Sequence, residues 1–93
     1  MKESAIEAKL VKGVSKAGWM AVKLVSPGAA GMPDRMLISP SGHVVFVELK
    51  TETGKLTALQ IAQIARLRKH KQDVRVLYGS NDVSAFLTEI RGR

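Results

Sequence analysis

The chain has 93 residues, 45% of them hydrophobic, which suits one small domain with a single core and leaves no room for a second. It has no cysteine, which excludes disulfides and thiolate metal sites, and no apolar run long enough for a membrane span or a signal peptide, so we expect a cytoplasmic protein. The formal net charge of +7 favours a polyanionic partner, most simply nucleic acid, and the alternative is a basic protein with no such partner.

Residues 3–17 are predicted to form a helix that ends before Gly18. Its buried face is defined by apolar residues at helical spacing: Ile6, Leu10 and Val14. Glu3 and Glu7 fall inside the same arc. Glu3 stands at the helix start, where a carboxylate favours the helix dipole. Glu7 lies a full turn further in and should approach the core, where a carboxylate needs a partner, unless it reaches water from the flank of the helix.

Residues 19–25 alternate loosely and are rich in Val, which predicts a first strand that includes Lys23. Residues 26–33 form a loop of mostly small side chains, and such a loop permits close approach of its backbone to another molecule. Ser26 and nearby N–H groups could donate to a phosphate backbone there. The alternative is a plain connection between two strands.

Two apolar runs, 36–38 and 44–47, flank the turn residues 40–42 and predict a hairpin. If the turn centres on Ser41, residues whose numbers sum to 82 lie opposite each other. Directly opposed side chains on an antiparallel pair have Cβ atoms roughly 4.5–5.5 Å apart. A slip of one residue would turn every side chain to the other face.

This register places Asp34 opposite Glu48, with Lys50 on the same face and Leu49 on the other. Two carboxylates at that range repel unless a cation lies between them, and a hard divalent ion such as Mg²⁺ prefers such oxygen ligands. The alternative is an edge hairpin with solvated charges. Arg35 should point to the face opposite Asp34, which suits a structural role or a contact to a DNA backbone better than catalysis.

A polar loop over 51–55 precedes a second helix, predicted over 56–71 and opening near Thr57. Its core stripe is predicted to consist of Ala58, Ile61, Ile64 and Ala65. Gln60 shares a flank with this stripe and should turn partly inward, where its amide can hold water or phosphate, or bond to the backbone. Basic residues crowd the end of this helix and complement its dipole.

Residues 74–78 predict the last strand, 79–82 a turn and N-cap cluster, and 83–90 a short closing helix. The predicted order is therefore αβββαβ with a short C-terminal helix, an α/β fold in which a mixed sheet is flanked by helices.

Pro33-Asp34 followed by Glu48-Leu49-Lys50 resembles the PD-(D/E)xK nuclease signature. Three flanking segments in order, 23–28, 31–35 and 56–60, make the chain similar to the VRR-NUC branch of that superfamily, over nearly its whole length. The closest similarity is to the small stand-alone versions of phages and bacteria. The resemblance implies a restriction-endonuclease-like core filled by the single domain 1–93, acting in the cytoplasm of a bacterium or a phage-infected cell.

The resemblance also assigns roles to individual residues. Asp34, Glu48 and the Leu49 carbonyl would hold Mg²⁺ or Mn²⁺, and Glu7, in preference to Glu3, would complete the acidic shell. Lys50 would orient or deprotonate the attacking water, and Gln60 would position it. The implied contacts to the DNA backbone are Lys23, Ser26, Arg35 and Lys55.

The implied function is a homodimeric Holliday-junction resolvase, a metal-dependent DNA endonuclease that leaves a 5′-phosphate and a 3′-hydroxyl. Trp19 or Met20 could form the dimer interface if they are exposed. The alternatives are a nickase or flap nuclease on other branched or single-stranded DNA, and a non-catalytic DNA-binding module that keeps the fold.

Overall fold

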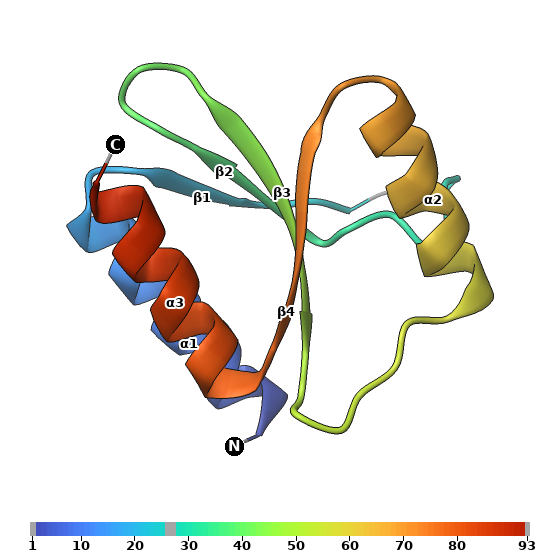
Figure 1. The fold of residues 1–93 in the computed structure, drawn as a ribbon, viewed down its shortest axis with the longest axis horizontal. Helices are drawn as coiled ribbons and strands as arrows, with labels where there is room; N and C mark the ends of the chain where they lie inside the picture. Colours follow the sequence, from blue (N-terminus) through green and yellow to red (C-terminus); the bar gives the residue numbers. More distant parts are fainter. Residues whose placement is uncertain (1, 26–27, 93) are drawn as a thin grey trace.

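The computed structural model describes residues 2–25 and 28–92, and it confirms the predicted α/β class and element order (Figure 1). The elements are α1 (Glu3–Lys16), β1 (Met20–Lys23), β2 (Arg35–Ile38), β3 (Val44–Lys50), α2 (Ala58–Lys69), β4 (Asp73–Tyr78) and α3 (Gly79–Arg91). Across the described ranges, none of these helices has the length and apolar character that a membrane crossing requires.

The four strands form one mixed sheet in the order β1-β2-β3-β4. The first three are antiparallel neighbours, and β4 joins β3 in parallel after the crossover through α2. The predicted hairpin register is confirmed, because Arg35 pairs with Val47 and Leu37 with Val45. Gly42 takes the positive φ of 91° that lets the chain reverse between β2 and β3.

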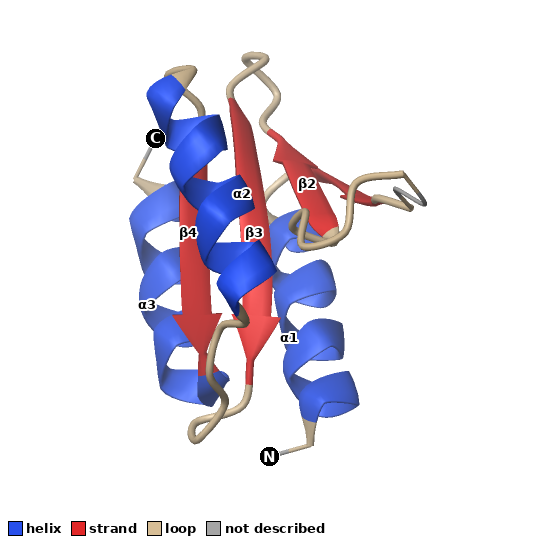
Figure 2. Ribbon diagram, turned by 90° about the vertical axis from the view of Figure 1, so that its right-hand side faces the viewer, coloured by secondary structure: helices blue, strands red, loops and turns tan. Residues whose placement is uncertain are grey.

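The helices divide between the two faces of the sheet, α1 and α3 on one and α2 on the other (Figures 1 and 2). The predicted face of α1 is confirmed, since Ile6, Leu10 and Val14 are fully buried. They pack in one apolar cluster with residues of the sheet and of α3: Leu37, Val45, Val47, Leu49, Leu77, Val83, Phe86, Leu87 and Ile90. The main core therefore lies between the sheet and the α1–α3 pair.

Two predictions about the ends of elements are wrong. The first strand was predicted over 19–25 but runs from Met20 to Lys23. Trp19 lies in the core with 6% exposure, so it cannot supply an exposed dimer contact. Residues 79–82 form the first turn of α3 and not a separate turn. Gly79 enters the helix with φ 77°, and the Asp82 carboxylate accepts the Tyr78 backbone N–H (2.8 Å), so the capping group lies inside the helix.

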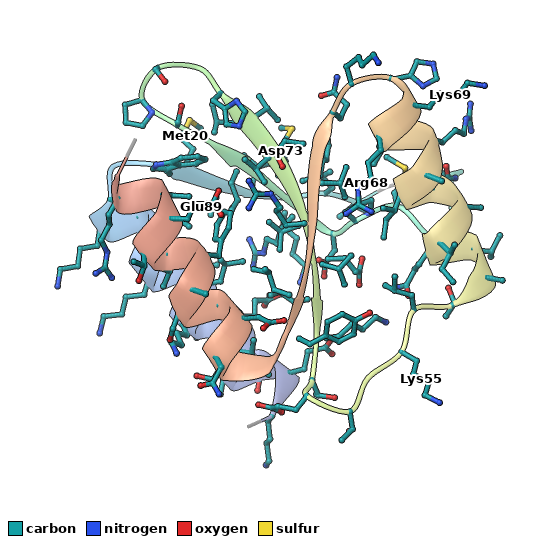
Figure 3. The ribbon with its side chains drawn as sticks, viewed as in Figure 1. Met20, Lys55, Arg68, Lys69, Asp73 and Glu89 are labelled. Carbon is teal, nitrogen blue, oxygen red and sulfur yellow. The ribbon has the colours of Figure 1, made fainter. Side chains whose placement is uncertain are left out.

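The predicted core stripe of α2 is also wrong, apart from Ile64. Ile64 is buried, but Ile61 is 56% exposed and Ala58 and Ala65 are exposed too. The reason is that α2 rests mainly on β4 and has no second helix beside it, so only a narrow stripe can be covered. Near its C-terminal end, the Arg68 guanidinium donates to the Val74 carbonyl (2.8 Å) and ties α2 to β4 (Figure 3).

Candidate active site

The β2–β3 pair brings two carboxylates together at one end of the sheet. Asp34 directly precedes β2, and continuing the observed register places it opposite Glu48. The Leu24 N–H donates to the Asp34 carbonyl (2.8 Å) and holds that backbone against the end of β1. Burial and the nearby Asp34 charge raise the pKa of Glu48 to about 7. The two carboxylates therefore form one electrostatic unit, as the register requires.

The Asp34 carboxylate also has an unsatisfied oxygen. Its Oδ1 atom is buried and has no hydrogen-bond partner within the described residues. A buried acceptor without a partner costs about 1–3 kcal/mol, and more when it is charged. An unpaired carboxylate oxygen beside a second carboxylate is an environment that a divalent cation would relieve.

Gln60 connects α2 to this carboxylate pair. Its Nε2 donates to Glu48 Oε2 (3.2 Å), which confirms that Gln60 turns inward. Its Oε1 accepts the Thr57 backbone N–H (2.9 Å), and the Gln60 N–H donates to Thr57 Oγ1 (3.1 Å). This reciprocal capping box starts α2 at Thr57 as predicted, and it fixes which end of the amide meets Glu48. The Thr-x-x-Gln spacing was the sequence signal for this link, and sequence reasoning missed it.

Lys50 lies two residues beyond Glu48 on the same face of β3 and is half-buried. Its charge lowers the pKa of Glu48, against the larger effects of burial and Asp34. The Leu49 side chain belongs to the core on the opposite face, with 3% exposure. Only its backbone carbonyl is therefore left as a possible ligand, as the resemblance implies.

A pocket of about 270 Å³ opens beside Asp34 towards the start of α1. It is lined by Glu3, Ser4, Glu7, Lys23, Asp34 and Leu49. Asp34 thus lies between this pocket on the α1 side and the Glu48–Gln60 pair on the α2 side. Larger and better enclosed cavities lie elsewhere on the molecule, but they are lined by neither Asp34 nor Glu48.

The two glutamates of α1 have different surroundings in this pocket. The Glu7 carboxylate pairs with the Arg35 guanidinium (3.4 Å), which is the partner that a half-buried carboxylate needs. Glu3 is exposed, and its charge contributes to the raised pKa of Glu48. Within the described ranges, no three carboxylate or imidazole side chains converge on one possible metal position. A metal held here would depend on two carboxylates, a carbonyl and water.

The three candidate DNA contacts that the structure describes differ in their surroundings. Lys23 is exposed at the rim of the pocket, and Lys55 extends from the loop between β3 and α2 (Figure 3). The Arg35 side chain is only 12% exposed and is held by Glu7, which favours its structural role. Ser26 lies outside the described residues.

Comparison with known proteins places this geometry in a family. The family model of the VRR-NUC domain matches residues 2–81. A curated relative, "Putative nuclease p44" of Acyrthosiphon pisum secondary endosymbiont phage 1, is 41% identical over 90 residues, which span 97% of this chain and 96% of the relative. A solved structure of a VRR_NUC domain superposes with a TM-score of 0.85 at 30% identity, covering 92% of this chain and 94% of that one.

Proposed function

The chain belongs to the VRR-NUC domain family, and from this premise we propose that it is a Mg²⁺- or Mn²⁺-dependent endonuclease that hydrolyses phosphodiester bonds in branched DNA. The observation that carries the proposal is the pairing of Asp34, with its unsatisfied buried oxygen, and Glu48, whose pKa is raised to about 7. Such a pair is strained in the absence of a cation and becomes favourable with one.

The residues present fit a hard divalent ion. Asp34, Glu48 and the Leu49 carbonyl offer oxygen ligands only, and the chain has no cysteine that would favour a softer metal. Glu7 would join through water, since its carboxylate already pairs with Arg35. When bound, Mg²⁺ would polarise a phosphoryl oxygen and make a coordinated water more acidic.

Lys50 is the group that this chain offers to the attacking water. Its ammonium stands beside Glu48 on the substrate face, where it would orient the water and stabilise negative charge on the phosphoryl oxygens. The water oxygen would form the new bond to phosphorus as the bond to the 3′ oxygen breaks. The attacking water releases a proton and the departing 3′ oxygen takes one up, which leaves a 3′-hydroxyl and a 5′-phosphate.

The main role of Gln60 would be to hold the Glu48 carboxylate in place. Its amide oxygen is engaged by the capping box, and one N–H binds Glu48, which leaves the second N–H for water or phosphate. Helix α2 thereby restrains the orientation of a metal ligand. This role differs from direct positioning of the water, which the resemblance implies.

The net charge of +7 supports a DNA substrate, because cationic side chains bind phosphates with a salt-dependent affinity. Lys23, which precedes Asp34 in the chain, and Lys55, which follows Glu48, are both exposed. These two lysines would contact the DNA backbone, together with Ser26. We assign Arg35 the structural role, because its guanidinium pairs with the Glu7 carboxylate.

We further propose that two copies act together as a Holliday-junction resolvase. A two-fold dimer suits a four-way junction, because two symmetric strands must be cut. Large apolar side chains are exposed on β1, on the segment after it and on α2, and a second copy could bury them: Met20, Val25, Leu59 and Ile61. Light scattering coupled to gel filtration would give the molar mass in solution, and a monomer at all concentrations would contradict the dimer.

The activity is tested by cleavage of labelled DNA with Mg²⁺ or Mn²⁺, comparing a four-way junction, a flap and a linear duplex. We expect paired symmetric cuts in the junction, and a loss of at least about 100-fold for Lys50→Ala. Lys12→Ala is the matched control, since it removes the same charge from an exposed position on α1. It should retain wild-type activity.

Other outcomes would favour the alternative functions. Cutting of flaps and single-ended branches as readily as junctions would indicate a nickase or flap nuclease. Binding without cleavage under either metal would indicate a non-catalytic DNA-binding module. Unchanged cleavage by both Lys50→Ala and Asp34→Asn would refute the assigned active site.

A further inference from the structure

Tyr78 lies next to β3, the strand that carries Glu48 and Lys50, on the side away from Asp34. It ends β4, and it is the parallel register partner of Lys50, so both side chains project from the same face of the sheet. Neighbouring strands lie about 4.8 Å apart. Across that face the order is therefore Asp34 beside β2, then Glu48 and Lys50 on β3, then Tyr78 on β4.

Tyr78 is more exposed than the Trp and Phe residues of the chain. The chain has one Trp, one Tyr and two Phe, and of these Trp19 and Phe86 are buried and Phe46 is half-buried. Tyr78 is 37% exposed. Along the same face of β4, Val74 is buried and Val76 half-buried, so exposure increases towards the end of the strand. Figure 2 shows the reason, since α2 covers the upper part of β3 and β4 and leaves their arrowhead ends below it.

The backbone that carries Tyr78 is firmly held. Its N–H donates to the Asp82 carboxylate (2.8 Å), and β3 pairs with it on one side. The next residue, Gly79, has φ 77° and lies so close to Glu52 that an added Cβ would meet the Glu52 Cγ at 2.5 Å. The Ser80 N–H donates to the same Glu52 carboxylate (3.5 Å). An aromatic ring on such a framework loses little freedom when it binds another molecule.

We propose that Tyr78 is a substrate-contact residue whose ring stacks on a nucleobase next to the scissile phosphate. This inference rests on the proposed nuclease function. With the phosphate over Glu48 and Lys50, one flanking nucleotide falls over β4, where the Tyr78 ring is the exposed apolar surface. Bases within a duplex are already stacked on both sides. The ring can therefore act only on a base uncovered at a branch point or a strand end, which makes Tyr78 a determinant of selectivity for branched over linear DNA.

The test compares Tyr78→Phe, Tyr78→Leu and Tyr78→Ala in two assays. Fluorescence anisotropy with Ca²⁺ in place of Mg²⁺ measures Kd for a labelled four-way junction and for a linear duplex. Single-turnover cleavage with Mg²⁺ then separates binding from the chemical step. Thr88→Ala is the control, because Thr88 is uncharged and exposed on α3, which covers the other face of the sheet.

We expect Tyr78→Phe to bind the junction like the wild type, because the ring remains. Tyr78→Ala should bind it on the order of 5- to 100-fold more weakly, with Tyr78→Leu between them and the cleavage rate at saturation little changed. Binding of linear duplex should change less than about twofold. Melting temperatures show whether each variant is folded. Tyr78 is not part of the main core cluster, and Tyr78→Phe, which keeps the ring, should melt like the wild type.

Three outcomes of the binding assay would overturn the inference. They are wild-type junction binding by Tyr78→Ala, an equal loss for Tyr78→Phe and Tyr78→Ala, and an equal loss on junction and duplex. A shift of molar mass in Tyr78→Ala would also overturn it, because it would make the ring a contact between two copies. If the wild type cuts no DNA, the proposed nuclease function is refuted independently of Tyr78. The anisotropy assay then still tests whether the Tyr78 ring contributes to junction binding.

Discussion

The two faces of the sheet are built differently. On the α1–α3 face, side chains from two helices and three strands close over one another, and Ile6, Leu10 and Val14 have no exposed surface. On the α2 face, one helix rests on one edge strand, only Ile64 of that helix is buried, and the ends of the strands stay open. All the candidate catalytic side chains, Asp34, Glu48, Lys50 and Gln60, belong to the open face or its rim.

This difference separates stability from chemistry. A closed apolar face supplies most of the free energy of folding, and a charge buried there needs a partner. Arg35 has that partner in Glu7, although the Arg35 Nε atom makes no hydrogen bond within the described residues. The open face retains two carboxylates that repel each other and a carboxylate oxygen without a partner. Such destabilising groups persist where function requires them and where the rest of the fold is stable enough to hold them.

The largest expected effect is on the free energy of unfolding, and it is measured with a matched pair of Ile→Ala substitutions, one on each face of the sheet. Ile6→Ala removes a fully buried side chain from α1 and should lower the free energy of unfolding by about 2–5 kcal/mol, from lost burial and the cavity left behind. Ile61→Ala removes a side chain that is 56% exposed on α2 and should change it by less than about 0.5 kcal/mol. Urea denaturation of the two variants measures the difference directly.

A large loss in Ile61→Ala would contradict the description of α2 as an exposed helix in solution. If the loss shrank as the protein was diluted, the Ile61 side chain would be buried between two copies. A small loss in Ile6→Ala would instead show that α1 contributes little to the folded state.

The same contrast explains which parts of the fold were predictable. The spacing of Ile6, Leu10 and Val14 predicted α1 because a helix on a closed face repeats its apolar residues at every turn. The alternation around a turn at Ser41 predicted the hairpin register, since one face of each strand is buried. The stripe of α2 failed because its apolar residues are not all buried, and periodicity cannot say what covers a helix. The prediction of a separate turn over 79–82 was wrong because residues that favour N-cap positions also occur in the first turn of a helix.

The second prediction concerns the contact that joins the 28–34 loop to α2. Gly31 has φ 88°, and a Cβ there would lie 2.6 Å from the Leu59 carbonyl carbon and oxygen and 2.9 Å from the Gln60 nitrogen. Gly31→Ala should therefore displace the first turn of α2, which orients Gln60 against Glu48. We expect a loss of about 1–3 kcal/mol beyond the strain of the positive φ, and a fall in kcat larger than the change in KM.

Gly42→Ala is the control, because Gly42 has a similar φ of 91° but open space around it. It should cost about 1 kcal/mol from backbone strain alone and leave kcat unchanged. Equal stability and kcat for the two variants would show that the loop does not position α2.

The candidate site was predicted less completely than the fold. The register predicted Asp34 opposite Glu48 with Lys50 on the same face, because cross-strand geometry needs only the turn position. The sequence could not show that Arg35 would bind Glu7, since the two lie on different elements and meet only after α1 docks on the sheet. Tyr78 was missed for a similar reason, because parallel pairing of β4 with β3 is not encoded in any local pattern.

The smallest expected effect is a gain in stability, from Glu48→Gln in the metal-free protein. The pKa of Glu48 is raised from 4.5 to about 7, so the folded state holds this proton more tightly than the unfolded chain does. The stabilising contribution is present below about pH 4.5 and is lost as the pH rises through about 7. Glu48→Gln removes the charge, and its side-chain oxygen can still accept the Gln60 amide hydrogen bond. It should therefore melt at a higher temperature than the wild type at pH 8 and at nearly the same temperature near pH 4.5.

The difference between the two proteins must be compared at each pH, because other groups titrate with the opposite sign. Hydrogen bonds from Arg75 and His43 lower the pKa of Asp73, which contributes stability that is lost in acid, equally in both proteins. Adding Mg²⁺ at pH 8 should then raise the melting temperature of the wild type more than that of Glu48→Gln, and so reduce or reverse the gap. If Mg²⁺ stabilised both proteins equally, Glu48 would not be a metal ligand. If the gap were the same at pH 4.5 and pH 8, neither the burial of the Glu48 charge nor its repulsion from Asp34 would be the source of the instability on the open face.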